Sequence, residues 1–515
     1  MARVVVVGAG MGGLSAAARL AAAGHQVTVC EQAPDVGGKL GELRRDGFAF
    51  DTGPHLLTLP AVYRDLFLKT GAPLESVVEL ERLDPACHYR FGDGTELDVP
   101  GGTRAALVRA LDDGLGDGAG AQWSAFLDRA GRIWDLTRGP FLESALDVRA
   151  LTRQAARPGD VAAIAPWRSL RGLGAQYLRH PHLRTLLDRY ATYTGSDPRR
   201  APAALATVPY VEQTFGSWYV RGGMRRLGEA VRDRAVERGV RIRLGADVVE
   251  VLVAAGRACG VALADGSRVD ADVVVANADA RHLYRDLLPG GPGAAGRRAL
   301  RRTVPSLSGF VLLLALRGRT PGLRHHTVLF PEDYDDEFDS IFATGPHRRT
   351  GPRPVPDPTV YVCAADDPSS RPDDDSEAWF VLVNAPRHLP ADTAARLAKS
   401  GDGRGESGVD WDAPGLADSY ADRILDVLAA RGLDVRDRVL WREVRSPAEL
   451  ERRTRAVGGS IYGTSSNGAR SAFLRPANRS PVPGLFLVGG SSHPGGGLPL
   501  VGMSAALVAE LVGRA

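Results

Sequence analysis

Residues 3–13, RVVVVGAGMGG, decide the fold of this chain. The β-branched run at 3–7 is typical of a strand that is buried on both faces. The small, helix-forming residues at 11–23 predict a helix that Gly24 ends. A second apolar run at 26–31, QVTVCE, predicts another strand. Together the three segments predict a β-α-β unit at the start of the chain and a protein of the α/β class.

The loop between the first strand and the helix carries Gly8, Gly10, Gly12 and Gly13, which satisfy the pattern G-x-G-x-x-G. In this pattern one glycine permits a tight turn, one lets a pyrophosphate approach the backbone, and one lets helix and strand pack closely. The start of the helix would present free N–H groups and its positive dipole end to the phosphates. Glu31, which ends the second strand, would accept hydrogen bonds from ribose hydroxyls. Because its carboxylate would repel a 2′-phosphate, the loop is not predicted to bind NADP.

A glycine pattern alone is weak evidence, because residues 291–296, GPGAAG, match it too. That copy comes after Leu-Pro-Gly instead of a strand and contains a proline, so we expect a loop there. The segment after the second strand favours FAD over NAD. Gly37 and Gly38 would let another backbone segment pass the pyrophosphate, and Lys39 would offset phosphate charge. A further segment that we expect near the cofactor contains Gly53, Pro54 and His55.

Composition excludes several classes of function. The 515 residues carry 64 basic and 61 acidic side chains, a net charge of +3, so no nucleic-acid footprint is visible. No uninterrupted apolar run approaches the roughly 18–20 residues of a membrane span. Cys30, Cys87, Cys259 and Cys363 lie far apart without a CxxC pair, so we expect neither a disulfide framework nor a metal site. A strand that begins by Arg3 leaves no room for a cleavable signal, which favours a cytoplasmic location.

Segments of the nucleotide-binding type recur in the middle and at the end of the chain. A helix is predicted from Arg225 to Arg238, and a closing helix over 498–512 comes after a buried strand at 485–488. Further strands are predicted at 240–244, 246–254, 258–264 and 268–276.

The position of these segments predicts two domains. One cofactor domain would be assembled from residues 1–75, 215–280 and 455–515. Residues 76–214 and 281–454, richer in amphipathic helix and mixed strand, would form an α+β substrate domain.

Four stretches resemble the phytoene desaturase family of FAD-dependent, amine-oxidase-like oxidoreductases. They are residues 8–54 (GAGMGG to DTGP), 208–230 (VPYVEQTFGSWYVRGGMRRLGEA), 325–338 (HHTVLFPEDYDDEF) and 475–505 (RPANRSPVPGLFLVGGSSHPGGGLPLVGMSA). The resemblance implies a glutathione-reductase-like FAD domain of the Rossmann type and a substrate domain with a long apolar tunnel. Members of the family dehydrogenate, isomerise or otherwise transform linear polyenes, mostly carotenoids. Hydride transfer to flavin N5 is therefore implied for this bacterial-type sequence.

The resemblance also assigns residues position by position. The ADP half of FAD would be bound by Gly8, Gly10, Gly13, Glu31, Gly38 and Lys39. Val248 would contact the adenine through its backbone. The ribityl and pyrophosphate region would be held by Gly489, Gly490 and Ser491, although many flavoenzymes of the wider superfamily have Gly-Asp where this chain has Gly490-Ser491. The isoalloxazine would be faced by the start of the last helix, Gly497, Leu498, Pro499 and Leu500.

The C-terminal stretch is similar to hydroxycarotenoid 3,4-desaturases and to flavoenzymes that cyclise polyene tetramate macrolactams. Desaturation of a carotenoid-type polyene is the leading prediction, and redox cyclisation of a macrolactam in natural-product biosynthesis is the alternative. A non-enzymatic prenyl-lipid carrier shares this fold but need not keep the flavin apparatus. NADPH as an external reductant has no second well-formed loop here, and no C-terminal cysteine is placed for covalent flavin attachment, so FAD is expected to be non-covalent.

Desaturation needs only a weak base, because the allylic cation that hydride loss leaves is acidic. His493 lies between the last strand and the glycine-rich loop, and His55 comes after Gly-Pro near the expected flavin edge; each would either act as the base or hold its loop by hydrogen bonds. Glu212 would line the tunnel or form a salt bridge on a helix surface. No metal-ligand spacing is found: His325 and His326 are adjacent, and neighbouring strand residues point to opposite faces.

Two further features concern the hydrophobic substrate. The aromatic residues Tyr210, Phe215, Trp218 and Tyr219 would grip a conjugated chain or belong to the core. Residues 168–189 mix Leu and Tyr with many Arg, so they would form either a basic amphipathic helix for peripheral membrane contact or a solvated face that Pro181 interrupts. The sequence leaves the oligomeric state open.

Overall fold

The first strand lies at the centre of a parallel sheet. The computed structural model describes residues 1–145, 157–400, 407–468 and 471–515. Five parallel strands form the sheet in the order β19-β13-β1-β2-β9. Their bounds are β1 Arg3–Val7, β2 Gln26–Cys30, β9 Arg241–Arg243, β13 Val273–Ala276 and β19 Leu485–Leu487. The predicted β-α-β unit and the strands near residues 241 and 485 are confirmed, and the sheet joins the start, middle and end of the chain.

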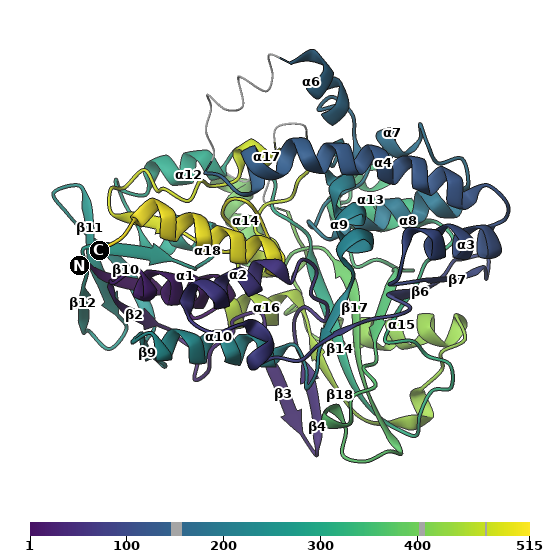
Figure 1. The fold of residues 1–515 in the computed structure, drawn as a ribbon. Helices are drawn as coiled ribbons and strands as arrows, with labels where there is room; N and C mark the ends of the chain where they lie inside the picture. The colour runs from purple at the N-terminus through teal and green to yellow at the C-terminus, as the bar shows by residue number, and fades with distance from the viewer. Residues whose placement is uncertain (146–156, 401–406, 469–470) are drawn as a thin grey trace.

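Alternate residues of β1 face two different layers. Val4 and Val6 pack in the core beneath the helices, whereas Val5 and Val7 pack in a core under an antiparallel sheet. The helical layer consists of α1 (Met11–Ala22), α10 (Arg225–Glu237) and α18 (Leu498–Val512), and Figure 1 shows α1 beside the yellow α18. The opposite layer is the sheet β10 (Val248–Ala254), β11 (Arg257–Leu263) and β12 (Arg268–Asp270). A strand that is apolar on both faces is therefore sandwiched between helices and a second sheet.

The single strand predicted over 268–276 is wrong, because the chain forms two strands there. β12 belongs to the antiparallel sheet, and β13 belongs to the parallel one. The chain changes sheets at Ala271 and Asp272, whose N–H groups donate to the carbonyls of Cys259 and Arg3 respectively. The two halves look like one strand in the sequence because both are rich in valine, and only the tertiary partners separate them.

A large sheet of seven strands dominates the other half of the molecule (Figure 1). Its order is β18 (Val439–Arg445), β14 (Ser308–Arg317), β17 (Ser376–Ala385), β16 (Val360–Cys363), β15 (His326–Leu329), β6 (Cys87–Arg90) and β7 (Glu96–Val99). All neighbours are antiparallel except β15 and β6. One face packs against α15 (Leu416–Ala430), and the other packs against the hairpin β3 (Glu42–Arg45) and β4 (Phe48–Asp51) through Phe48 and Phe50. The mixed sheet with helices confirms an α+β second half beside the Rossmann-type half.

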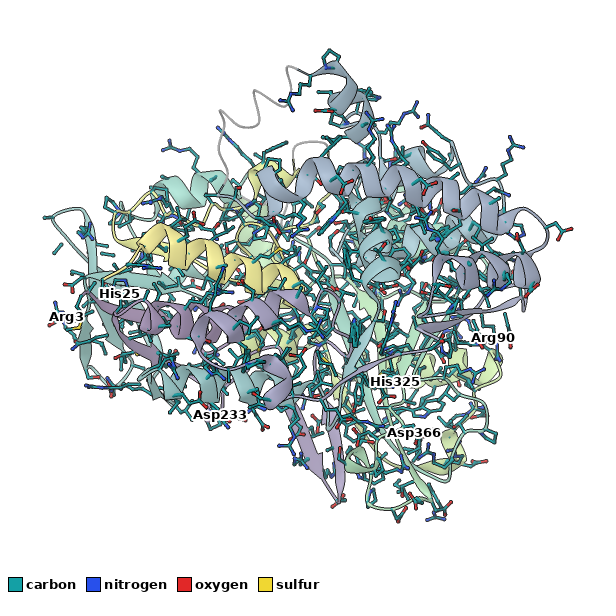
Figure 2. The ribbon with its side chains drawn as sticks, viewed as in Figure 1. Arg3, His25, Arg90, Asp233, His325 and Asp366 are labelled. Atoms are coloured by element: carbon teal, nitrogen blue, oxygen red, sulfur yellow. The ribbon has the colours of Figure 1, made fainter. Side chains whose placement is uncertain are left out.

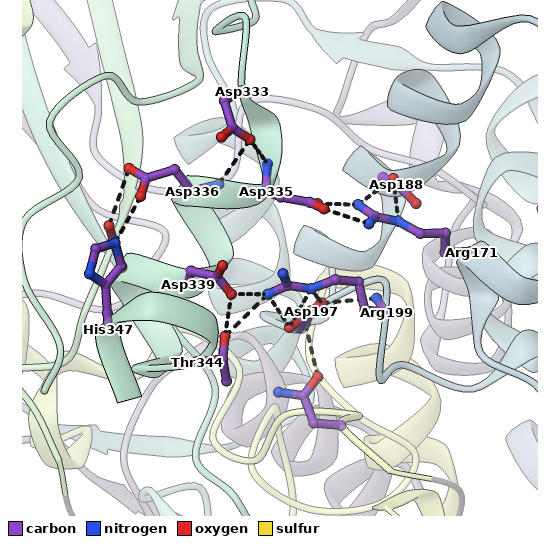
Figure 3. A network of polar contacts seen from close by, with 12 residues as sticks. Arg171, Asp188, Asp197, Arg199, Asp333, Asp335, Asp336, Asp339, Thr344 and His347 are labelled. Carbon is purple, nitrogen blue, oxygen red and sulfur yellow. Dashed lines mark hydrogen bonds and ion pairs between the residues drawn. The ribbon is translucent and has the colours of Figure 1, made fainter. Parts of the chain in front are cut away.

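A helical layer completes this half, and partly buried ion pairs connect its parts. Arg171 binds the carboxylates of Asp188 and Asp335, at 2.8 and 2.5 Å (Figure 3). Arg199 likewise binds Asp197 and Asp339, at 2.9 and 2.7 Å. The helices are α3 Arg104–Leu115, α4 Ala119–Thr137, α6 Pro158–Ile164, α7 Leu170–Gly174, α8 Pro181–Thr192, α9 Thr207–Phe215 and α13 Tyr334–Phe342. Arg171 thus joins α7 to α13, and Arg199 joins the loop before α9 to α13.

The remaining elements lie around these layers. They are α2 Ala61–Thr70, β5 Leu80–Arg82, β8 Trp218–Val220, α11 Ala280–His282, α12 Ala294–Leu300, α14 Ala391–Ser400, α16 Pro447–Thr454 and α17 Ser471–Leu474. Residues 291–296 run from a turn into α12, so no strand precedes this second glycine pattern.

The basic stretch at 168–189 does not form one amphipathic surface helix. It divides into α7 and α8. The charge of Arg171 is paired with the carboxylates of Asp188 and Asp335. Arg189 is buried, with its guanidinium over the rings of Tyr193 and Tyr89. Within the described residues, no helix is long and apolar enough to span a membrane.

Candidate active site

The turn that contains Gly8 to Gly13 is packed so closely that side chains at several of its glycines would clash with neighbouring atoms. Gly8 has a φ of +94°, which favours glycine. A Cβ on Gly13 would lie 2.1 Å from the carbonyl oxygen of Gly8, and one on Gly12 would lie 2.6 Å from Oδ1 of Asn277. The helix α1 therefore begins directly over the end of β1, with its first N–H groups facing the loop, as a phosphate-binding turn requires.

A second glycine segment passes close to this loop. The N–H of Gly37 donates to the carbonyl of Ala9 at 2.9 Å, and a Cβ on Gly38 would lie 3.2 Å from Cα of Gly10. Both Gly37 and Gly38 have positive φ, +112° and +60°. The structure thus brings together the two backbone segments that the sequence assigned to one cofactor.

Glu31 lies at the end of β2 with its carboxylate beside the loop. Its oxygens accept hydrogen bonds from the N–H groups of Ala9 at 2.6 Å and Ala33 at 2.9 Å, and the residue is only 7% exposed. The carbonyl of Glu31 also accepts from the N–H of Ala246, two residues before the buried Val248 at the start of β10. The predicted ribose and adenine contacts, Glu31 and Val248, therefore lie on connected segments.

The C-terminal segment closes on the same loop. A Cβ on Gly12 would approach Cα of Gly489 to 3.0 Å, which places the end of β19 beside the start of α1. The hydroxyl of Ser491 accepts from the N–H of Ala280 at 2.9 Å. Gly490 is partly buried beside Gly496, and the N-terminus of α18 carries Gly497, Leu498, Pro499 and Leu500. Three distant pieces of sequence meet at one end of the parallel sheet, where nucleotides bind in open α/β sheets.

These residues fit a dinucleotide. Cβ atoms on Gly10, Gly12 and Gly13 would clash with Asn277 or with the carbonyl of Gly8, so this close-packed turn requires glycine, and the acid lies at the end of the neighbouring strand. Asn277 was not predicted from the sequence: its amide lies against the loop, with Nδ2 3.5 Å from the carbonyl oxygen of Gly8. Its position directly after β13, the neighbour of β1, is the signal that would have found it.

Lys39 occupies an unexpected position. Its ammonium donates to the carbonyls of Ser460 at 2.8 Å and Ile461 at 2.6 Å. Burial lowers the pKa of Lys39 to about 8, and the carboxylate of Asp279 opposes this shift. In the structure the side chain therefore connects the second glycine segment to residues 460–461.

A pocket lies where the hairpin β3–β4 meets the seven-stranded sheet. Its lining includes Phe50, His55, Tyr219, Cys363 and Phe380. The rings of His55 and Phe380 are 3.9 Å apart between centroids. Burial lowers the pKa of His55 to about 3, so its imidazole is neutral, and its Nδ1 has no hydrogen-bond partner within the described part of the chain. Gly53 and Pro54 lead into this position beside Lys39, because a Cβ on Gly53 would meet the Lys39 carbonyl.

The other two candidate bases each have one structural partner, and each also keeps one buried polar atom without a partner among the described residues, Nδ1 of His493 and Oε2 of Glu212. Nε2 of His493 lies 3.1 Å from the carbonyl oxygen of Ser144, and burial lowers the pKa of this histidine. Glu212 is 6% exposed and accepts a hydrogen bond of 2.7 Å from the hydroxyl of Tyr190. Burial raises the pKa of Glu212. The alternative of a surface salt bridge for Glu212 is therefore wrong, because the helix face that carries it is turned inward.

The four aromatic candidates do not form one cluster. Tyr219 lines the pocket, where its hydroxyl donates to Asp367 at 3.0 Å and its ring lies 4.7 Å from that of His325. Trp218 is its neighbour in β8 and points the other way, beneath the guanidinium of Arg64. Tyr210 packs against Gly131 in α4, and Phe215 packs against Trp134 of the same helix. Of the four, Tyr219 alone lines this pocket, and the role of the others in binding substrate stays a prediction.

The expectation that His325 and His326 point to opposite faces is wrong. Their ring centroids are 4.5 Å apart. His325 precedes β15, so the alternation of side chains along a strand does not separate the two rings. Figure 2 shows His325 among the strands of the large sheet.

A five-stranded parallel sheet with a glycine loop at its end, joined to a second half with a mixed sheet and a pocket, is an architecture of oxidoreductases that bind a nucleotide cofactor. Residues 11–373 match the family described as "Flavin containing amine oxidoreductase". The chain is 33% identical over 518 residues to a 4,4'-diapolycopene oxygenase of Methylomonas sp, covering 99% of this chain and 98% of that protein. It is 35% identical over 524 residues to a hydroxyneurosporene desaturase of Rubrivivax gelatinosus, covering 99% and 92%.

The chain belongs to the phytoene desaturase family of the flavin-containing amine oxidoreductases, and it is a flavin-dependent oxidoreductase. A solved structure of putrescine oxidase bound to putrescine superposes with a TM-score of 0.60, at 16% identity and 99% coverage of both chains. That likeness shows the shared fold of the two halves.

Proposed function

We propose that the protein is an FAD-dependent desaturase that oxidises a long hydrophobic polyene of the carotenoid class. The observation that carries this proposal is a neutral histidine, His55, in a pocket whose wall includes Phe50, Tyr219 and Phe380. His55 comes two residues after Gly53, which lies against Lys39 of the second glycine segment. The relatives that are named for carotenoid substrates match over almost the whole chain. With the domain division proposed from the sequence, the cradle and one wall of the pocket, including Phe50, His55 and Tyr219, belong to the cofactor domain, and the opposite wall, including Cys363 and Phe380, belongs to the substrate domain.

FAD is preferred over smaller flavins because Glu31 and the two glycine segments would hold an ADP half. Glu31 would turn its carboxylate from the N–H of Ala9 toward ribose hydroxyls, and the glycines at 8–13 and 37–38 would surround the pyrophosphate. The N-terminus of α18 would stabilise negative charge near the ring. The cysteines lie at positions 30, 87, 259 and 363, none of them in the C-terminal segment, which supports non-covalent binding.

Bound FAD supplies a hydride acceptor. Phe50, Phe380 and Tyr219 would pack against a bound polyene and keep water from the reacting bond. The unpartnered Nδ1 of His55 would accept the proton from the carbon next to the one that loses hydride. His493, whose Nε2 contacts a carbonyl, would hold the loop that precedes α18. Hydride and proton together leave as a hydrogen pair, and a new double bond forms.

Anaerobic incubation of the flavin-loaded protein with an acyclic hydroxycarotenoid tests the proposal. We expect the flavin absorption to bleach while the carotenoid spectrum shifts to longer wavelength and its mass decreases by a hydrogen pair. A parallel incubation uses a polyene tetramate macrolactam. Bleaching or cyclisation with the macrolactam alone would replace the proposed substrate, and a colourless protein that binds no flavin would remove the proposal altogether.

Location and membrane contact are part of the proposal. A cytoplasmic protein that takes a lipid-dissolved polyene needs contact with a membrane surface. Flotation with anionic vesicles at low salt, with the flavin-loaded protein, measures this contact directly. Recovery of all protein at the bottom of the gradient would contradict peripheral binding.

A further inference from the structure

Two histidines beside the pocket, the partly buried His325 and the buried His326, have ring nitrogens without partners. Nε2 of His325 and Nε2 of His326 are enclosed and make no hydrogen bond within the described part of the chain. His326 is 2% exposed, and its other nitrogen, Nδ1, lies 2.8 Å from the hydroxyl of Tyr361. Buried polar atoms almost always find a partner in native proteins, so unpaired nitrogens that lie together indicate a missing ligand.

Cys363 faces the same point. His326 in β15 is directly opposite Cys363 in the antiparallel strand β16, and residues opposed in this way project from the same face. His325 joins them because its ring lies at 63° to that of His326 and 4.5 Å away. One ligand atom from each of His325, His326 and Cys363 lies within 4.8 Å of the others.

The protonation of the cluster suits a cation. Burial lowers the pKa of His325 to about 4 and the pKa of His326 well below its ordinary value, so both imidazoles present lone pairs at neutral pH. Burial raises the pKa of the Cys363 thiol. A bound metal ion overrides such a shift, because it deprotonates a coordinating thiol, and the proton is released to solvent.

The charges around the cluster also bear on a cation. The carboxylates of Asp366 and Asp367 act on His325 and favour positive charge there. The buried guanidinium of Arg189 acts on His326 in the opposite sense, and it is shared with the rings of three tyrosines, Tyr89, Tyr193 and Tyr361. The two carboxylates therefore favour a cation at His325, and Cys363 borders the pocket from which the cation would enter.

We propose that His325, His326 and Cys363 bind one Zn²⁺ ion at the wall of the substrate pocket. Two imidazole nitrogens and one thiolate are ligands of the kind that Zn²⁺ prefers, and three protein ligands leave a fourth position open. Ligand atoms around tetrahedral Zn²⁺ are separated by about 3.3–3.8 Å, so the side chains must close by about 1 Å from their present spacing. Rotation about χ1 and χ2 provides this movement without a change in the backbone register of β15 and β16.

The site is independent of the reaction proposed above, and its test does not use activity. The full-length, flavin-loaded protein is stripped with chelator, incubated with Zn²⁺, desalted and analysed for metal by mass spectrometry. We expect one zinc ion per chain, and zinc-edge X-ray absorption with one sulfur and two imidazole ligands. Substitution Cys363→Ser should remove the sulfur signal and weaken Zn²⁺ binding at least tenfold, as should His326→Gln. The control Cys259→Ser, in the distant sheet of β11, should keep the sulfur signal and the wild-type affinity for Zn²⁺.

The result on the wild-type protein decides the proposal even if a variant fails to fold. A zinc content well below one ion per chain after reconstitution would overturn the proposed metal site. So would zinc bound without a sulfur ligand, or zinc bound equally by folded wild-type and Cys363→Ser proteins, because each places the ion elsewhere. Retention of flavin by the variants shows that they are folded.

Discussion

The ammonium of Lys39 donates a hydrogen bond of 2.6 Å to the carbonyl oxygen of Ile461, more than four hundred residues further along the chain. A second bond of 2.8 Å joins it to the carbonyl of Ser460. The lysine that the sequence assigns to the cofactor phosphates thus also connects the second glycine segment with the approach to the C-terminal segment. Phosphate and carbonyl oxygens attract the same charge, so both roles depend on the protonated form.

The first prediction concerns the pH dependence of stability through Lys39. Its pKa in the folded protein is about 8, below the ordinary 10.5. Between these values the unfolded chain holds the proton and the folded chain does not, so the free energy of unfolding rises with pH. Relative to Lys39→Met, the flavin-free wild-type protein should gain at most about 3 kcal/mol between pH 8 and 10.5. Urea unfolding at a series of pH values measures this difference.

Two controls accompany that experiment. The exposed Lys69, paired with Asp65, should show no such gain when it is changed to Met. Saturation with FAD should flatten the pH dependence, because a nearby phosphate raises the pKa of Lys39. A wild-type curve parallel to that of Lys39→Met in the absence of flavin would contradict the lowered pKa of the partly buried Lys39.

The glycine cradle gives the second prediction. In Gly13→Ala the new Cβ would meet the carbonyl oxygen of Gly8 at 2.1 Å, which only a shift of α1 relieves. We expect the purified variant to lose nearly all flavin, measured as the ratio of visible to protein absorbance. The matched control is Gly291→Ala in the other glycine pattern, where a Cβ meets nothing within 4 Å. Equal flavin content in the two variants would remove the cradle from the cofactor site.

Glu31 gives the third prediction. Its carboxylate accepts from two backbone N–H groups and would accept from ribose, and bonds to a charged acceptor contribute about 1.5–3 kcal/mol each. Glu31→Gln keeps the shape but removes the charge, so the dissociation constant for FAD should rise by about tenfold to a hundredfold. Fluorescence titration of the flavin-free protein measures it. An unchanged constant would mean that the ribose is held by other residues.

The fourth prediction separates chemistry from cofactor binding. His55→Ala removes from the pocket the imidazole whose Nδ1 has no partner, and it leaves the glycine loops intact. The rate of flavin bleaching by the polyene should fall about 100-fold or more, with flavin content unchanged. His347→Gln, which changes a histidine paired with Asp336 instead, should leave the rate as it is. If His55→Ala bleaches at the wild-type rate, another group or solvent accepts the proton.

Local patterns in the sequence were sufficient for the cofactor half. The β1–α1–β2 unit, α10 and α18 result from period-two and period-3.6 patterns and from glycines that tolerate positive φ. These features depend on neighbours in the chain, so they are visible without a structure. The strand predicted at 268–276 failed because two sheets share one valine-rich run, and no local signal marks the change of partner.

The sequence by itself determined the dinucleotide loop, the acid that comes after it and the family. Tertiary structure decided where isolated polar residues lie: Lys39 on the carbonyls near residue 461, Glu212 inside instead of on a surface, and His325 beside His326 and Cys363. The reason is physical. A loop that surrounds phosphates is built from consecutive backbone groups, whereas a pocket or metal site collects side chains from strands that only sheet register brings together.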